Sequence, residues 1–128
     1  MEKTVLPQVD FQYLVEFLPD FYVILLPNSY EIVAASNGYL AATTTKRESI
    51  LGFTLFDVLP ESLKMRTSDL KDSFDIVMKT KAADTMAVRK YDKEKGAFIQ
   101  GYWKALNTPI LNENGEIAFI MHSIEDVR

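Results

Sequence analysis

One histidine is the main candidate for acid–base or metal chemistry in this sequence. His122 stands in the middle of a predicted strand, and the chain has no cysteine to serve as nucleophile or thiolate ligand. A lone histidine builds neither a catalytic triad nor a metal site by itself. We therefore predict a structural or surface role for His122, and leave open a polar contact with a ligand or a pH-sensitive contact.

Carboxylates are numerous, and a close pair of them could do general acid–base chemistry. Five fall at predicted helix ends, strand ends and turns, which favours solvated or capping roles: Asp57, Asp84, Asp92, Glu125 and Asp126. The five glycines are isolated and never form a phosphate-binding spacing. We predict that the chain is not an enzyme, and a small enzyme using His122 with a carboxylate stays as a third hypothesis.

Length and composition indicate one globular domain. The 128 residues are 48% hydrophobic and include eight Phe, six Tyr and one Trp, which favours a packed core over disorder. The net charge of −4 comes without a basic patch, so we expect no nucleic-acid partner. No apolar run approaches the roughly 20 residues of a membrane helix, and no signal peptide is visible, so we predict a cytoplasmic protein without membrane insertion.

The first part of the chain predicts a helix followed by a hairpin. Apolar residues recur at helical spacing over residues 9–18, Asp10 is a candidate N-cap, and Pro19 ends the helix. Residues 21–26 and 30–35 predict two strands joined by a turn.

Short helical segments are predicted next. Asn37 is a candidate cap for a helix through residue 42, and Thr45 with Glu48 fits a capping box for another. Gly52 ends that second helix, and residues 56–59 predict one more helical turn before Pro60.

A longer helix and three strands complete the prediction. Residues 68–80 carry an apolar stripe at helical spacing, formed by Leu70, Phe74, Val77 and Met78. The period then changes to two over residues 85–91, 97–109 and 117–127, which are separated by polar turns. This order predicts an α+β fold in which the five strands form one antiparallel sheet.

The order of the elements and several short segments resemble the PAS family. In chain order these segments are Leu18-Pro19-Asp20, Ile32-Val33-Ala34-Ala35-Ser36-Asn37, Ile50-Leu51-Gly52 with Leu55-Phe56, and Tyr102-Trp103-Lys104-Ala105-Leu106-Asn107-Thr108-Pro109. The last of them resembles strand segments in PAS domains of bacterial sensor histidine kinases. The resemblance covers residues 9–128, and implies a single sensor domain over residues 1–128 with an N-terminal helix at 9–18 and a core at about 20–128. It also implies that short helices and one longer helix lie on one face of the five-stranded sheet.

The C-terminal residues are similar to the Asp-Ile-Thr ending at which PAS cores pass into an output helix. The resemblance implies a signal relay through Glu125 and Asp126, and an output domain such as a kinase further along the protein. Arg128 stands where the family has Thr, so the hydroxyl part of that junction is missing.

The resemblance also implies where a ligand pocket would be lined. The candidates are Tyr39, Leu40, Phe56, Phe74, Met78, Met86, Val88 and Trp103. The alternative is that these side chains simply fill the core. Absence of cysteine excludes a covalent flavin adduct, and residues 68–80 hold no histidine for haem, so the cofactor is left unknown.

The N-terminal helix carries more large apolar residues than one buried face needs. We expect Phe11, Leu14, Phe17 and Leu18 to form a homodimer contact, unless the helix only covers its own core. Two hypotheses for function follow: a sensor domain of bacterial signal transduction that relays ligand or partner binding, or a ligand-free dimerisation and protein-interaction module.

Overall fold

A computed structural model describes residues 7–59, 67–92 and 97–126, and omits the side chains of Thr67, Asp126 and residues 87–92 and 97–103. The elements are α1 (Phe11–Glu16), β1 (Phe21–Leu25), β2 (Ile32–Ala35), α2 (Asn37–Thr43), α3 (Arg47–Ile50), the 3₁₀ helix η1 (Leu55–Asp57), α4 (Thr67–Thr80), β3 (Asp84–Asp92), β4 (Ala97–Leu111) and β5 (Ile117–Asp126).

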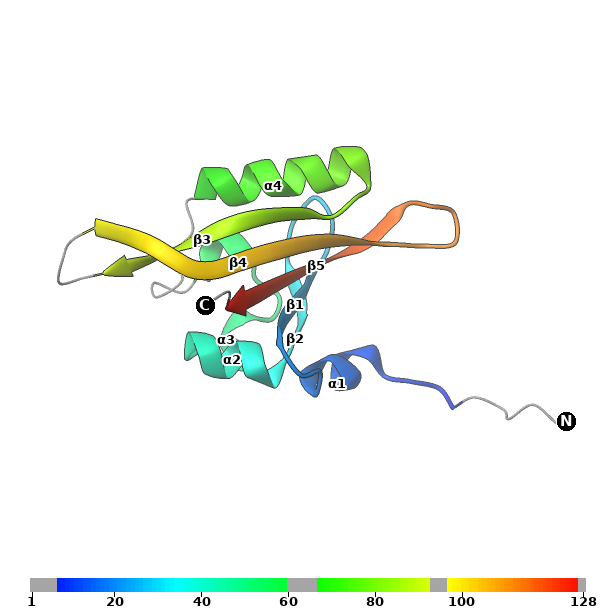
Figure 1. Ribbon diagram of the computed structural model, residues 1–128. Coiled ribbons are helices and arrows are strands. Elements are labelled where there is room, and N and C mark those ends of the chain that lie inside the picture. Colours follow the sequence, from blue (N-terminus) through cyan, green and yellow to red (C-terminus); the bar gives the residue numbers. More distant parts are fainter. Residues whose placement is uncertain (1–6, 60–66, 93–96, 127–128) are drawn as a thin grey trace, which may run out of the picture.

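The strands form one antiparallel sheet in the order β2-β1-β5-β4-β3. The last strand in the sequence therefore lies in the centre of the sheet, between β1 and β4 (Figure 1). The predicted α+β class and five-stranded antiparallel sheet are confirmed.

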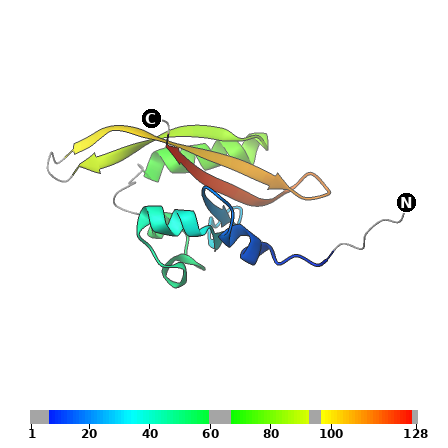
Figure 2. The same ribbon diagram turned by 60° about the horizontal axis from the view of Figure 1, so that its bottom comes forward.

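The helices pack against different strands of the sheet. Helix α4 packs along β3 and β4, whereas α2 contacts β1 and α1 contacts β2 (Figures 1 and 2). The predicted apolar stripe of α4 is confirmed, because Leu70, Phe74 and Val77 are fully buried and Met78 packs against them. These side chains form one core with alternate residues of β1, β4 and β5.

Helix α1 is shorter than predicted. Asp10 is its N-cap, since the carboxylate accepts hydrogen bonds from the backbone N–H groups of Gln12 and Tyr13. The helix ends at Glu16, and Phe17 closes it with a tight backbone bond to Leu14. The restriction that Pro19 places on Leu18 keeps the chain from extending the helix further.

Ser36, not Asn37, caps helix α2. Its hydroxyl accepts from the backbone N–H groups of Tyr39 and Tyr22 and donates to the carbonyl of Asp20. One side chain thus ties the start of α2 to the start of β1. Gly38 fits this junction because a Cβ there would lie 2.8 Å from the Asp20 carbonyl oxygen.

The predicted capping box at Thr45 is wrong. Helix α3 begins at Arg47, one position too late for Glu48 to occupy the third helical position, and its N-cap Lys46 makes no side-chain cap bond. The Thr45 hydroxyl instead pairs with the Thr43 hydroxyl at 2.8 Å. Thr43 is anchored in turn on the Tyr39 carbonyl.

Candidate functional site

A row of polar side chains crosses the core-facing side of the sheet. Asp84 of β3 is the register partner of Asn107 of β4, and Asn107 is the partner of His122 of β5. Because directly paired residues in a sheet point to the same face, the register brings these three side chains together. Ser73 of α4 lies over the row and completes it.

The four side chains form a continuous hydrogen-bonded chain. His122 Nδ1 lies 2.6 Å from Asn107 Oδ1, Asn107 Nδ2 lies 2.8 Å from Ser73 Oγ, and Ser73 Oγ lies 2.6 Å from Asp84 Oδ2. The chain links β5, β4, α4 and β3. It runs from the middle of the sheet to the half-buried carboxylate at the start of β3.

The carboxylate sets the direction of every bond in this chain. Ser73 donates its single hydroxyl hydrogen to Asp84 Oδ2. Ser73 must then accept from the amide nitrogen of Asn107, which turns the amide oxygen toward His122. His122 therefore carries its proton on Nδ1, and Nε2 is a bare acceptor.

The imidazole of His122 is fully buried. Burial lowers the pKa of His122 to about 4, so the ring is neutral at pH 7. Nε2 is also buried and has no hydrogen-bond partner among the described residues. A buried polar atom of this kind is costly, and such atoms call for an explanation.

Aromatic rings connect His122 to the surface. Phe74 meets the imidazole edge to face, with ring centroids 6.2 Å apart, and Tyr30 stacks on Phe74 at 4.6 Å. Phe56 packs edge-on against both Tyr30 and Phe74. Outside them lies an open depression of about 370 Å³ lined by Asn28, Ser29, Tyr30, Phe56 and Lys71.

Six of the eight predicted pocket residues belong to the core or pack against it. Tyr39 and Phe74 are buried, and Leu40, Phe56, Met78 and Met86 pack against them. Burial raises the pKa of Tyr39 to about 12, so its hydroxyl stays protonated. Val88 and Trp103 are register partners of β3 and β4, but their side chains lie outside the described part. Their role in a ligand pocket stays a prediction.

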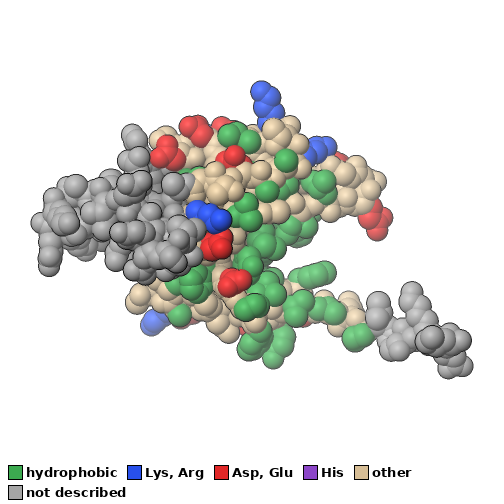
Figure 3. Space-filling model, in the orientation of Figure 1, with side chains coloured by type: hydrophobic (Ala, Val, Ile, Leu, Met, Phe, Trp, Pro, Cys, Tyr) green, Lys and Arg blue, Asp and Glu red, His purple; other side chains and the backbone are tan. Residues whose placement is uncertain are grey.

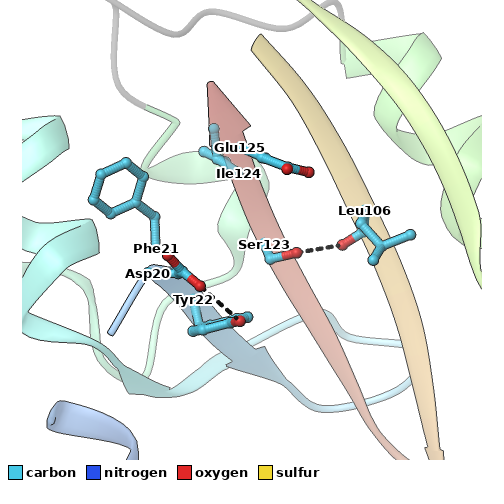
Figure 4. A pocket seen from close by; sticks show the side chains of 7 residues that line it. All are labelled: Asp20, Phe21, Tyr22, Leu106, Ser123, Ile124 and Glu125. Atoms are coloured by element: carbon cyan, nitrogen blue, oxygen red, sulfur yellow. Dashed lines mark hydrogen bonds between the residues drawn. The ribbon is translucent and has the colours of Figure 1, made fainter. Parts of the chain in front are cut away.

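A second depression, of about 440 Å³, lies where β1 begins and β5 ends, and Leu106 of β4 also lines it (Figure 4). The Tyr22 hydroxyl donates to Asp20 at 3.5 Å, and Ser123 donates to the Leu106 carbonyl at 3.3 Å. Burial, and then the neighbouring Asp20 carboxylate, raise the pKa of Tyr22. Glu125 lines the same depression.

The two predicted relay residues lie at the C-terminal end of β5. Glu125 is exposed and pairs with Lys104 of β4 at 3.3 Å. The backbone of Asp126 pairs with Trp103, and its side chain lies outside the described residues. The predicted solvated or capping role is wrong for Asp84, because its carboxylate accepts a hydrogen bond from Ser73 in the buried chain.

Helix α1 presents large apolar side chains to solvent. Phe11 is 77% exposed, Phe17 is 62% exposed and Leu14 is half-exposed, while Leu18 is partly covered. Figure 3 shows hydrophobic side chains both over α1 and over the sheet above it. The helix is held to its own domain by the bond from Gln12 to the Val33 carbonyl and by the 3.5 Å ion pair of Glu16 with Arg47.

The sequence patterns did not predict a role for Ser73, Asn107 or Tyr30. A signal existed for two of them: Ser73 lies on the buried stripe of α4, three residues after Leu70, and Asn107 alternates with the buried Ala105. A polar residue in an apolar stripe indicates a buried hydrogen bond. Tyr30 has no comparable signal, because its importance depends on its backbone conformation.

Comparison with known proteins gives a clear likeness in three dimensions. No protein-family model and no curated protein matches the sequence. The sensory box sensor histidine kinase of Vibrio cholerae matches with a TM-score of 0.64 and 22% identity over 92% of this chain and 90% of that chain. The PAS domain of the fruit-fly ELK potassium channel matches with a TM-score of 0.59 and 21% identity over 84% and 86%.

A third structure, the PAS domain of Bordetella pertussis BvgS, matches with a TM-score of 0.60 and 13% identity over 91% of this chain and 81% of that chain. These likenesses show that the chain has the PAS fold. No helix in the described ranges is long and apolar enough to cross a membrane.

Proposed function

We propose that this chain is a cytoplasmic signal-sensing domain of a bacterial signal-transduction protein, such as a sensor histidine kinase. A ligand or partner biases the core, and the last strand passes the change to an output domain. The PAS fold supports this proposal, as does the likeness to a sensory box sensor histidine kinase.

The observation that carries the proposal is the position of His122. Strand β5 is the central strand of the sheet, and His122 links it to α4 and β3 through Asn107, Ser73 and Asp84. A change at this ring would alter hydrogen bonds that reach β4, α4 and β3. The same strand ends at Glu125 and Asp126, where we place the relay to the output domain.

We further propose that the domain has no catalytic activity of its own. A histidine base in a triad is oriented by a carboxylate that stabilises its charged form. In this chain the partner of Nδ1 is the neutral amide of Asn107, and burial disfavours the imidazolium. Both features suit a neutral hydrogen-bonding ring better than a proton carrier.

The second candidate function is a ligand-free dimerisation and protein-interaction module. The exposed Phe11 and Leu14 of α1, with Phe17 at its C-terminal end, favour it, because exposed apolar patches mark interaction surfaces. The two functions are compatible in one protein, but they differ in whether the core has to bind a small molecule.

Hydrogen exchange tests the sensing proposal. One sample is used as purified, and a second is unfolded in urea, dialysed and refolded to remove any bound molecule. We expect slower exchange in β5 of the first sample, because an occupied core opens less often. Peptides from α1 serve as the internal control, since no residue of that helix is buried.

Two results separate the hypotheses. If β5 exchanges faster in the refolded sample and slows again when the dialysate is added back, the result supports a ligand sensor. Identical exchange in both samples contradicts ligand sensing and favours the interaction module.

A further inference from the structure

The hydrogen-bonded chain ends at an atom that can still accept. Each hydrogen bond from His122 through Asn107 and Ser73 is donated toward Asp84. The bare lone pair of His122 Nε2 is left at the inner end of the chain. Nε2 is buried and unpaired among the residues that the structure describes. A protein that needed only a filled core could place an apolar side chain here at lower cost.

The surroundings of Nε2 define the chemistry of its partner. Val23 faces His122 across the β1–β5 pair, and Phe74 covers the ring from α4. Both are fully buried, and the buried Ile120 and Ile124 lie on either side along β5. An acceptor in an apolar site binds a neutral group that donates one hydrogen bond, because burying a charge costs far more.

Three aromatic rings in mutual contact lie between the surface and His122. The surface depression of about 370 Å³ touches Tyr30 and Phe56, these pack on Phe74, and Phe74 contacts His122. Tyr30 and Phe74 are therefore the side chains that separate the depression from the imidazole.

Tyr30 has a strained backbone. Its φ of 59° lies in the left-handed region, which is rare for a bulky residue. The strain is maintained by its N–H bond to the Leu26 carbonyl and by the bond from the Leu55 N–H to its own carbonyl. Strain that the surroundings enforce is often found where a side chain must be held for function. Here it holds the ring against Phe74.

We propose that His122 Nε2 is the anchor for a small neutral ligand, an aromatic or aliphatic molecule with one hydroxyl or N–H donor, which reaches the core past Tyr30 and Phe74. This inference rests on the proposed sensing function and deepens it. Binding adds a donor to the free end of the chain, and the bonds through Asn107 and Ser73 carry the effect to α4 and β3.

Phenol and anisole test the inference, since both offer the same ring but only phenol donates a hydrogen bond. The uniformly ¹⁵N-labelled wild-type protein is titrated with each, and the imidazole nitrogens of His122 are followed by long-range ¹H–¹⁵N NMR. Phenol is expected to shift the Nε2 signal and to bind roughly three- to tenfold more tightly than anisole. Anisole should leave Nε2 unchanged.

Two variants complete the test. His122→Phe should abolish the preference for phenol, whereas Ser123→Ala, on the opposite face of the same strand, should keep it. The wild-type NMR signal decides the matter even if His122→Phe fails to fold. Equal affinities, an unchanged Nε2 signal with bound phenol, or no binding of either probe each overturn the inference.

The sensing function has its own readout. Slower β5 exchange in the protein as purified, together with a failed phenol test, would remove the His122 anchor and leave the sensor intact. Failure of both experiments would remove both proposals.

Discussion

The hydroxyl of Ser73 is the link on which the buried chain depends, because it accepts from Asn107 and donates to Asp84. Ser73→Ala removes both bonds and leaves the buried amide without an acceptor. We expect a loss of about 1–3 kcal/mol in the free energy of unfolding, measured by urea denaturation. Ser49→Ala, an exposed change in α3, is the control and should stay within about 0.5 kcal/mol. Equal stabilities of the two variants would contradict the chain.

The low pKa of His122 makes stability depend on pH. Below pH 6.5 the unfolded chain takes up a proton on this ring, but the folded protein does not until about pH 4. Stability is therefore full above pH 6.5 and falls as the pH drops. From pH 6.5 to 5 we expect a loss of about 2 kcal/mol from this one group, at about 1.36 kcal/mol per pH unit.

His122→Gln isolates this effect, because the amide does not titrate while the carboxylates are unchanged. Urea denaturation at pH 7, 6 and 5 should show a slope in the wild type that the variant lacks. If the free energies of unfolding of the wild type and the variant changed equally with pH, the ring would not be buried in its neutral form. Of the described groups around the ring, the amide of Asn107 and the apolar Phe74 and Val23 carry no charge, and Asp84 lies at the far end of the chain.

The sequence alone predicted the strand position of His122 but not its burial or its partners. Burial depends on which face of β5 turns inward, and a shift of one residue exchanges the faces. Asn107 meets His122 only through the β4–β5 register, and Ser73 reaches them only through the docking of α4. The spacing of residues along the sequence does not predict contacts between elements that are far apart in the chain.

Helix α1 buries none of its residues, and its cap and two side-chain contacts hold it to the domain. Asp10→Ala removes both bonds to the first-turn N–H groups. We expect faster hydrogen exchange throughout α1, consistent with a cap worth about 1 kcal/mol, and an unchanged unfolding free energy for the domain. Asp10→Asn keeps a capping oxygen and should exchange like the wild type; loss of global stability on Asp10→Ala would show that α1 belongs to the core.

Periodicity predicted the type and order of the elements well, whereas their ends were less accurate. The buried stripe of α4 and the alternation in β5 are strong patterns, so both elements were placed to within a residue or two. Neighbouring candidates for a helix cap can differ by a single hydrogen bond. Ser36 caps α2 instead of Asn37, because the Ser36 hydroxyl also bonds to the backbone of Asp20 and Tyr22. That competition is decided by tertiary contacts.

At the scale of the whole molecule, the exposed side of α1 predicts self-association. Changing both Phe11 and Phe17 to Ser should weaken a homodimer by roughly tenfold or more, measured by analytical ultracentrifugation, without lowering the melting temperature. Phe53→Ser alters a similarly exposed ring outside α1 and is the control. The same weakening in the control would mean that the association is nonspecific.

Native mass spectrometry of the freshly purified domain, over a range of protein concentrations, tests the central claim of a ligand sensor most directly. We predict an added mass of constant value that stays with the protein at every concentration and is lost on denaturation. A clean mass of the bare chain that changes only between monomer and dimer would contradict the claim and leave the interaction module.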